Sequence, residues 1–182
     1  MDDNMEVENG MRLIISDRPL DLPGRGHITD EWIDLSKLRL ANCVGCFGCW
    51  TKTPGKCVIR DDAVKVYPRI AESSRVMYIS RLRYGGYDTP MKTMLERAIP
   101  IQQAFLRLVD GETHHVQRRV VPKRAVIIGY GARSDEEQAL FRRLVARNAR
   151  NMNFERHRVV FATEQDLEQT VREEVLAWEA SC

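Results

Sequence analysis

The chain has 182 residues, a length that suits one domain with a buried core of its own. Hydrophobic residues make up 43% and charged residues 30%, as in an ordinary globular protein. The 28 Lys and Arg against 26 Asp and Glu give a net charge of +2, without the basic excess of a nucleic-acid binder. No apolar run approaches the roughly 18 residues that cross a bilayer, and the acidic N-terminus lacks a secretory signal. We therefore expect a cytoplasmic protein that binds neither membranes nor nucleic acid.

Alternating strands and helices are predicted from residue 11 onward, after a lead at residues 1–10 that we expect to be disordered. Short apolar runs predict strands at 11–16, 75–80, 123–129 and 157–162, with a further short strand at 32–35. Capping residues and helical periodicity predict helices at 61–73 and 89–98, from Ser134 and from Thr163, and helical register over 101–109.

This order of elements predicts one α/β domain over residues 11–182, with a parallel sheet of four or five strands and helices on both faces. Too few residues separate the first two predicted strands for an ordinary helix, so the first helix is missing or degenerate. Ligands of open parallel sheets bind beyond the carboxyl ends of the strands. The loops at 17–30, 81–89 and 130–134 are therefore the candidate binding region.

Four of the five cysteines lie in one short segment, as Cys43, Cys46, Cys49 and Cys57. Their C-x-x-C-x-x-C-x7-C spacing lets tight turns direct neighbouring thiolates at one centre, and the intervening glycines allow such turns. Four thiolates suit an iron–sulfur cluster or a tetrahedral zinc ion. A reducing compartment favours metal binding or redox chemistry over a disulfide framework.

Other interpretations of the cysteine segment stay open. Cysteine is often buried simply as a small hydrophobe, so the loop could keep free thiols without a metal. Zinc could also take the place of a cluster. Three cysteines at successive three-residue steps favour cluster ligation over the paired spacing of a zinc ribbon.

The stretch from Cys43 to Asp62 resembles a segment of NADPH-dependent FMN reductases, and its cysteine motif is similar to that of the iron–sulfur flavoproteins. Residues 84–87 (Tyr-Gly-Gly-Tyr) and the helix after them resemble that family's aromatic–glycine loop, and residues 111–115 resemble a Gly-Glu-Met-His-His segment of one branch. The resemblance covers roughly residues 43–150. It implies a flavodoxin-like three-layer α/β/α fold, bound FMN, electron transfer with NAD(P)H as a donor, and a homo-oligomer or a complex with a related redox subunit.

The resemblance also places the flavin ring against the loop after the third strand, near the cysteine loop. The residues expected to contact FMN are Ser80, Arg81, Tyr84, Gly85, Gly86 and Tyr87, with Arg18 as a candidate phosphate ligand. Glycines there permit close backbone approach, and the two tyrosines offer rings that can stack on a flat π-system.

The loop after the first strand departs from the family pattern. Family members hold the FMN phosphate there with a Ser- and Thr-containing loop at a helix N-terminus. Here Asp17 and Asp21 would repel a phosphate dianion, and the substitutes on offer are Arg18 and the segment 24–26 (Gly-Arg-Gly). We therefore expect weaker FMN binding than in relatives with the usual loop, or a partner subunit that completes the phosphate contacts.

Two smaller groups of side chains are interpreted conservatively. His114 and His115 would point to opposite faces of a strand, so they cannot easily serve one centre, and we expect an exposed loop pair. The basic cluster of Arg118, Arg119, Lys123 and Arg124 is expected to be solvated surface rather than a site for the phosphate of NADPH.

Three functions are compatible with these patterns. The leading hypothesis is a redox protein with FMN and a [4Fe–4S] cluster, acting as an NAD(P)H-dependent oxidoreductase or passing electrons between small-molecule or protein partners. The first alternative is a flavin-free partner subunit that keeps the fold and the cysteine centre and docks on a redox enzyme. The second is a zinc-stabilised structural module.

Overall fold

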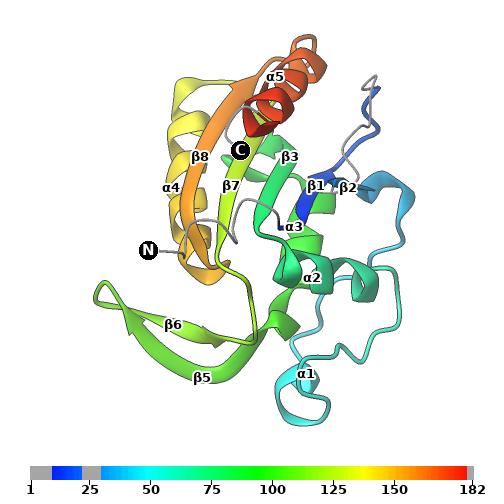
Figure 1. Cartoon of the computed structure of the whole chain (residues 1–182), viewed down its shortest axis with the longest axis vertical. Helices are drawn as coiled ribbons and strands as arrows, with labels where there is room; N and C mark the ends of the chain where they lie inside the picture. The colour runs from blue at the N-terminus through cyan, green and yellow to red at the C-terminus, as the bar shows by residue number, and fades with distance from the viewer. Residues whose placement is uncertain (1–9, 22–29, 180–182) are drawn as a thin grey trace.

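The fold is a mostly parallel sheet with helices on both faces, as the sequence predicts (Figure 1). The computed structural model describes residues 10–21 and 30–179. Most of the predicted lead therefore lies outside the described residues, as do Gly24, Arg25 and Gly26. No helix among the described residues is long and apolar enough to cross a membrane.

Five parallel strands run in the order β2-β1-β3-β7-β8, and a short strand, β4, pairs antiparallel with β3. The strands of this sheet are β1 (Arg12–Ser16), β2 (Asp30–Asp34), β3 (Arg75–Arg83), β4 (Gly86–Tyr87), β7 (Lys123–Tyr130) and β8 (Phe154–Ala162). Most of the connection between β1 and β2, at 22–29, lies outside the described residues, so the loss of the first helix stays a prediction.

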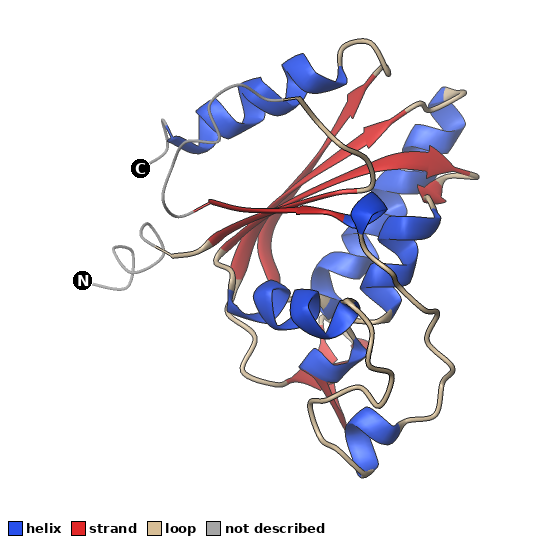
Figure 2. Cartoon of the chain, turned by 90° about the vertical axis from the view of Figure 1, so that its right-hand side faces the viewer, coloured by secondary structure: helices blue, strands red, loops and turns tan. Residues whose placement is uncertain are grey.

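Helices cover the two faces of the sheet unequally, with α5 on one face and α2, α3 and α4 on the other (Figure 2). The helices are α1 (Gly48–Thr51), α2 (Ala63–Glu72), α3 (Thr89–Glu96), α4 (Asp135–Asn151) and α5 (Leu167–Glu179), with 3-10 turns η1 (Leu35–Lys37) and η2 (Ile99–Ile101). Successive side chains of a strand point to opposite faces, so each buried strand contributes apolar residues to the cores on both sides of the sheet.

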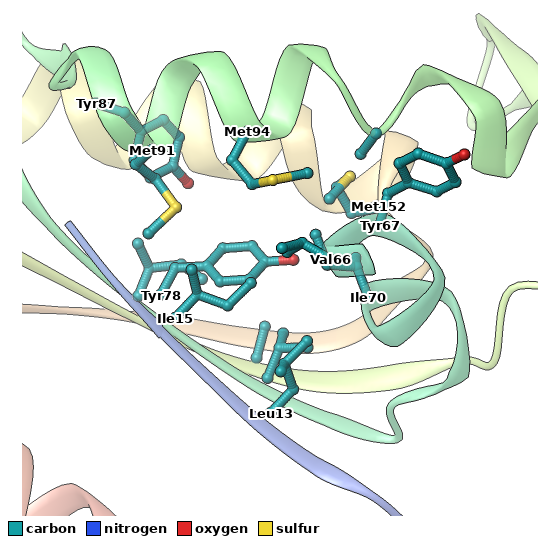
Figure 3. Packing of buried hydrophobic residues seen from close by; sticks show 14 of the residues in the cluster. Leu13, Ile15, Val66, Tyr67, Ile70, Tyr78, Tyr87, Met91, Met94 and Met152 are labelled. Atoms are coloured by element: carbon teal, nitrogen blue, oxygen red, sulfur yellow. The ribbon is translucent and has the colours of Figure 1, made fainter. Parts of the chain in front are cut away.

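The larger core lies between the sheet and α2, α3 and α4. Ile15 and Tyr78 of the sheet are buried beneath Met91 and Met94 of α3 (Figure 3). Ile14 points to the other face and packs beneath α5, whereas its neighbours Leu13 and Ile15 belong to the larger core. A strand buried on both faces needs such a continuous apolar run, and this explains why the predicted strands are confirmed.

The prediction of helical register over 101–109 is wrong. These residues form β5 (Gln102–Val109), which pairs antiparallel with β6 (Glu112–Gln117) in a separate two-stranded sheet. Asp110 and Gly111 join the strands with positive φ values of 51° and 79°. An Asp-Gly pair in this conformation is the favoured two-residue hairpin turn, so local turn chemistry prevailed over apolar spacing.

Gly129 of β7 marks a place where the sheet and helix layer approach closely. A Cβ atom there would lie 2.4 Å from Leu82 Cδ1 and 3.2 Å from Phe141 Cε1. We expect Gly129→Ala to lower the free energy of unfolding by about 1–3 kcal/mol through overpacking. The matched control is Gly86→Ala, whose Cβ would meet its nearest neighbour at 3.6 Å. Equal losses in the two variants, measured by urea denaturation, would contradict this account of the packing.

Candidate functional site

The four clustered cysteines lie on the long connection between η1 and α2. Cys43 and Cys46 are exposed, Cys57 is half-buried and Cys49 is buried. Gly45 and Phe47 both adopt positive φ, at 62° and 55°, which folds the segment back on itself ahead of α1. The cysteine loop, defined here as residues 41–61, therefore presents thiols both at the surface and against the protein body.

The four thiols lie close enough to influence one another electrostatically. Burial raises the pKa of Cys49, and the neighbouring thiols of Cys57, Cys43 and Cys46 raise it further. In the described part of the chain, no three His, Cys, Asp or Glu side chains are already arranged as a metal site. The donor set suits a thiolate-bound centre, and its convergence on one ion or cluster stays a prediction.

A buried arginine closes the cysteine loop. The side chain of Arg97 is 1% exposed, and it donates hydrogen bonds to both carboxylate oxygens of Asp61 at 2.6 and 2.8 Å. It also donates to the carbonyl of Ala41 at 2.7 Å and contacts Cys57 Sγ at 3.5 Å. Because Ala41 and Asp61 stand at opposite ends of the loop, one guanidinium group ties both ends to the C-terminal end of α3.

Asp61 completes this closure. Its carboxylate accepts the Ala41 N–H at 2.7 Å in addition to the bonds from Arg97. Burial raises the pKa of Asp61, but these hydrogen bonds and the charge of Arg97 outweigh it and hold the pKa below its usual value. The sequence by itself did not predict that Arg97 pairs with Asp61, although both residues lie in stretches that carry the family resemblance.

Aromatic contacts fix the middle of the loop. The Trp50 ring lies 5.4 Å from Phe47 and 4.6 Å from His115 of β6, and its Nε1 donates to the Ile99 carbonyl at 3.4 Å. His114 faces the other way, as expected for a strand, and is buried against Asn151 and Glu112. The expectation of an exposed histidine pair is therefore wrong, because both rings serve packing.

At the carboxyl ends of the strands, Asp17 directly follows β1, at the position where the family resemblance places the phosphate-binding loop. It is 8% exposed and accepts hydrogen bonds from the Arg81 N–H at 2.6 Å and the Tyr130 hydroxyl at 2.8 Å. Burial raises the pKa of Asp17 more than these bonds lower it. The carboxylate thus joins the ends of β1, β3 and β7 directly.

The two predicted arginines also have internal partners. Arg81 forms an ion pair with Glu164 at 2.7 Å, Arg18 lies 4.0 Å from the same carboxylate, and both guanidinium groups lie over the Tyr130 ring. Because Asp17 is buried beneath them and Glu164 already pairs with them, the described residues at this end do not fit the phosphate of FMN.

The loop after β3 matches its expected role only in part. Tyr84 is 86% exposed and free to stack on a flat ligand. Tyr87 is not available for stacking, because it is buried in edge-to-face contact with Phe141 at 4.9 Å. Gly85 has a φ of 72° and packs against Leu140, while Ser80 Oγ is used by the Asp88 N–H and the Arg81 carbonyl.

A cavity of about 780 Å³ opens beside Tyr84, between α3 and α4. Its apolar lining includes Leu95, Leu144 and Met152, with Asn148 among the polar groups. Its size lies within the range of pockets for small organic ligands. Together with the exposed Tyr84 ring, this cavity offers space for a small organic ligand.

The Tyr84 loop and the cysteine loop contact opposite ends of α3. Asp88 caps the start of this helix, and Arg97, which holds Cys57, follows its last residue. Eight helical residues span about 12 Å. A flavin ring that lies at Tyr84 and near the cysteines of the same chain stays a prediction.

Comparison with known proteins supports the resemblance seen in the sequence. No family model matches the chain. It is 31% identical over 78 residues to an iron–sulfur flavoprotein of Methanocaldococcus jannaschii, and 33% identical over 70 residues to one of Archaeoglobus fulgidus. These matches cover 43% and 38% of this chain but only 39% and 31% of the relatives. The chain thus aligns with about a third of the length of each curated relative.

The solved structures confirm the fold. An FMN-dependent NADH-azoreductase of Bacillus anthracis, determined with FMN, superposes with a TM-score of 0.54 at 14% identity. The match covers 94% of this chain and 97% of that one. The flavodoxin-like α/β fold predicted from the sequence is therefore the fold of this chain.

The Arg97–Asp61 pair is testable by mutation. Arg97→Gln leaves the Asp61 carboxylate without its counter-ion and is expected to cost about 3–5 kcal/mol of unfolding free energy. The matched control, Lys92→Gln, breaks the exposed Lys92–Glu96 pair on the same helix and should cost under about 1 kcal/mol.

The lowered pKa of Asp61 predicts how the stability of the protein changes with pH. Because the pKa of Asp61 is lowered in the folded state, its contribution is present above the ordinary value of 3.8 and is lost as pH falls through the folded value. We expect Asp61→Asn to remove that part of the acid dependence in urea titrations from pH 7 to pH 3. An unchanged slope would contradict it.

Asp17 is expected to oppose FMN. Asp17→Asn removes the negative charge at the carboxyl ends of the strands and keeps the side-chain shape, so it should tighten FMN binding severalfold in fluorescence titrations. Asp110→Asn in the β5–β6 turn is the control and should leave FMN affinity unchanged. Equal affinities in wild type and Asp17→Asn would show that this carboxylate does not limit phosphate binding.

Proposed function

We propose that this chain is a flavodoxin-fold redox protein, acting in electron transfer or as an NAD(P)H-dependent oxidoreductase, with an iron–sulfur cluster on its cysteine loop. The observation that carries the proposal is a loop of four cysteines whose two ends are held by one buried arginine on this fold. The iron–sulfur flavoproteins that match part of the chain support the same assignment.

Each cysteine has a distinct place in the proposed centre. Cys49 and Cys57 anchor it to the protein body, and Cys43 and Cys46 close it from the solvent side. An iron–sulfur cluster held by such thiolates supplies one-electron chemistry. Arg97 contributes a positive charge beside Cys57 Sγ, which would offset part of the negative charge of a thiolate-bound centre.

The exposed side of the loop offers a route for electrons. Val44 is 70% exposed and Phe47 58% exposed, beside two exposed thiols. A redox partner that contacts this surface would approach the centre without crossing the protein body. We propose a small molecule or a protein as the electron donor and acceptor, with NAD(P)H as a donor for the oxidoreductase form.

The flavin is the part of the proposal that this chain supports least. The cavity beside Tyr84 has room for a flat ring, but at the phosphate end Glu164 already pairs with Arg81 and Arg18, and Asp17 adds a buried carboxylate. This observation favours a second candidate, a flavin-free subunit that keeps the fold and the cysteine centre and docks on a redox enzyme. If a related subunit supplied the missing phosphate contacts, this chain could bind FMN in the complex although it binds FMN poorly by itself.

The decisive measurement is the visible spectrum of protein purified without oxygen, combined with iron, sulfide, zinc and flavin analysis. A brown protein with iron and sulfide supports the cluster, and released FMN with absorption near about 450 nm adds the flavin. Zinc without iron would replace the redox proposal with a structural zinc module. A colourless, metal-free protein that also fails anaerobic reconstitution would overturn the cluster.

Single cysteine replacements locate the centre. We expect Ser at each of Cys43, Cys46, Cys49 and Cys57 to lower the iron bound per chain, because each thiolate is a ligand. Cys182→Ser is the matched control and should leave iron unchanged. Iron contents that are the same in all five variants would show that the cluster, if present, is bound elsewhere.

A further inference from the structure

A row of arginines crosses the sheet at the amino ends of its strands. Arg75 of β3 pairs in register with Arg124 of β7, and Arg124 pairs with Arg156 of β8. On the other side Arg75 is in register with Arg12 of β1. Residues paired in register on parallel strands point to the same face, so like charges stand side by side. Like charges in such positions destabilise a sheet unless something neutralises them.

Arg75 is the most unusual member of this row. It is 2% exposed, and its Nη1 donates to the Trp178 carbonyl at the end of α5 at 2.8 Å. Its Nε and Nη2 atoms are buried and have no hydrogen-bond partner in the part of the chain that the structure describes. These two nitrogens form one edge of the guanidinium group, the edge that binds two oxygens of a phosphate or carboxylate in parallel. Burying charged donors without a partner costs free energy, and an anion bound at this edge would recover it.

The surroundings of Arg75 are consistently cationic. A cavity of about 230 Å³ is lined by Arg75, Arg124, Arg156, His157 and Arg158, with Ala125, Val126, Ala177 and Trp178. Arg158 is already neutralised by Glu174, which bonds to it through both carboxylate oxygens. Across residues 10–21 and 30–179, no carboxylate forms an ion pair with Arg75, Arg124 or Arg156. Three uncompensated guanidinium groups therefore face one small cavity.

We propose that this cavity is a binding site for a phosphate dianion, held by the Nε–Nη2 edge of Arg75 and by the side chains of Arg124 and Arg156. The cavity has room for a phosphoryl group but is smaller than the pockets that enclose whole organic ligands. The ligand is either free phosphate or the phosphoryl end of a monoester whose remaining part lies outside. A dianion matches three guanidinium groups better than a single carboxylate does.

This site is separate from the redox chemistry proposed above. It lies at the amino ends of the strands, whereas Asp17 and Tyr84 follow their carboxyl ends. Tyr130 lies six positions after Arg124 along β7, which amounts to about 20 Å of strand. Because Arg75 also donates to the Trp178 carbonyl near the end of α5, an anion bound there would fix that helix end against the sheet. The proposal stands or falls independently of the cluster and the flavin.

Lys123 and Arg124, two of the basic residues predicted to form a solvated cluster, lie on opposite faces of β7. Lys123 has no exposed surface, and its ammonium group donates to the Val121 carbonyl, so the expected solvated patch is not formed there. Burial lowers the pKa of Lys123 to about 8. Arg124, its neighbour in β7, points to the opposite face and joins the arginine row.

Phosphate binding is tested on the full chain by thermal unfolding and by ³¹P NMR. Inorganic phosphate should raise the unfolding temperature of wild type saturably, beyond NaCl at the same ionic strength, and should broaden the ³¹P signal. Arg124→Gln and Arg156→Gln should each weaken the apparent affinity about tenfold or more, since each removes a charge-assisted hydrogen bond. Arg143→Gln, an exposed arginine on α4, is the matched control and should bind as wild type does.

The comparison of ligands identifies the source of the phosphate. AMP binding more tightly than inorganic phosphate, with adenosine inactive, would assign the site to a phosphomonoester, and equal affinities would assign it to free phosphate. Arg75 is not used as a test position because it also supports α5. The proposal is overturned if phosphate acts no differently from NaCl, or if both Gln variants at 124 and 156 bind phosphate as well as Arg143→Gln does.

Discussion

The buried guanidinium of Arg97 is the interaction on which the cysteine loop depends. A loop of about twenty residues without long helices or strands has no core of its own, so its shape must be imposed from outside. Arg97 does this with one charged fork, which reaches Asp61, the Ala41 carbonyl and Cys57 Sγ from the end of α3. The desolvation cost of placing this charge at 1% exposure is offset only because its partners surround it. The same contacts set where the thiols lie and which charge they face.

The sheet distributes charge unequally between its two ends. At the carboxyl ends, Asp17 is enclosed by the Arg81 N–H and the Tyr130 hydroxyl, and the nearby arginines have Glu164 as a partner. At the amino ends, Arg75, Arg124 and Arg156 stand in register without such partners. In flavodoxin-like folds the carboxyl end is the place where an anionic cofactor is expected. In this chain the described residues compensate positive charge at that end and leave it uncompensated at the other.

The hydrogen bonds at the end of β1 explain part of this difference. A helix N-terminus after β1 would supply backbone N–H donors and a partial positive charge for a phosphate. Without it among the described residues, the end of β1 is stabilised by Asp17, which forms hydrogen bonds with β3 and β7. These bonds place a buried carboxylate where the phosphate of a cofactor would lie, which is why we predict weak FMN binding. The proposed redox chemistry then falls to the cysteine loop and the cavity beside Tyr84.

The sequence alone determined the parallel sheet and the grouping of the cysteines. Buried strands need continuous apolar runs, and cysteine motifs are local in sequence. The sequence misjudged 101–109, where the Asp110–Gly111 turn specified a hairpin, and it placed Tyr87 at a surface although the ring packs on Phe141. Only the tertiary structure brought Arg97 to Asp61, Asp17 to Tyr130, and Arg75 into register with Arg124 and Arg156. Each of these contacts joins residues far apart in the chain. Their partners are chosen by strand order and helix packing, which no local pattern of residues records.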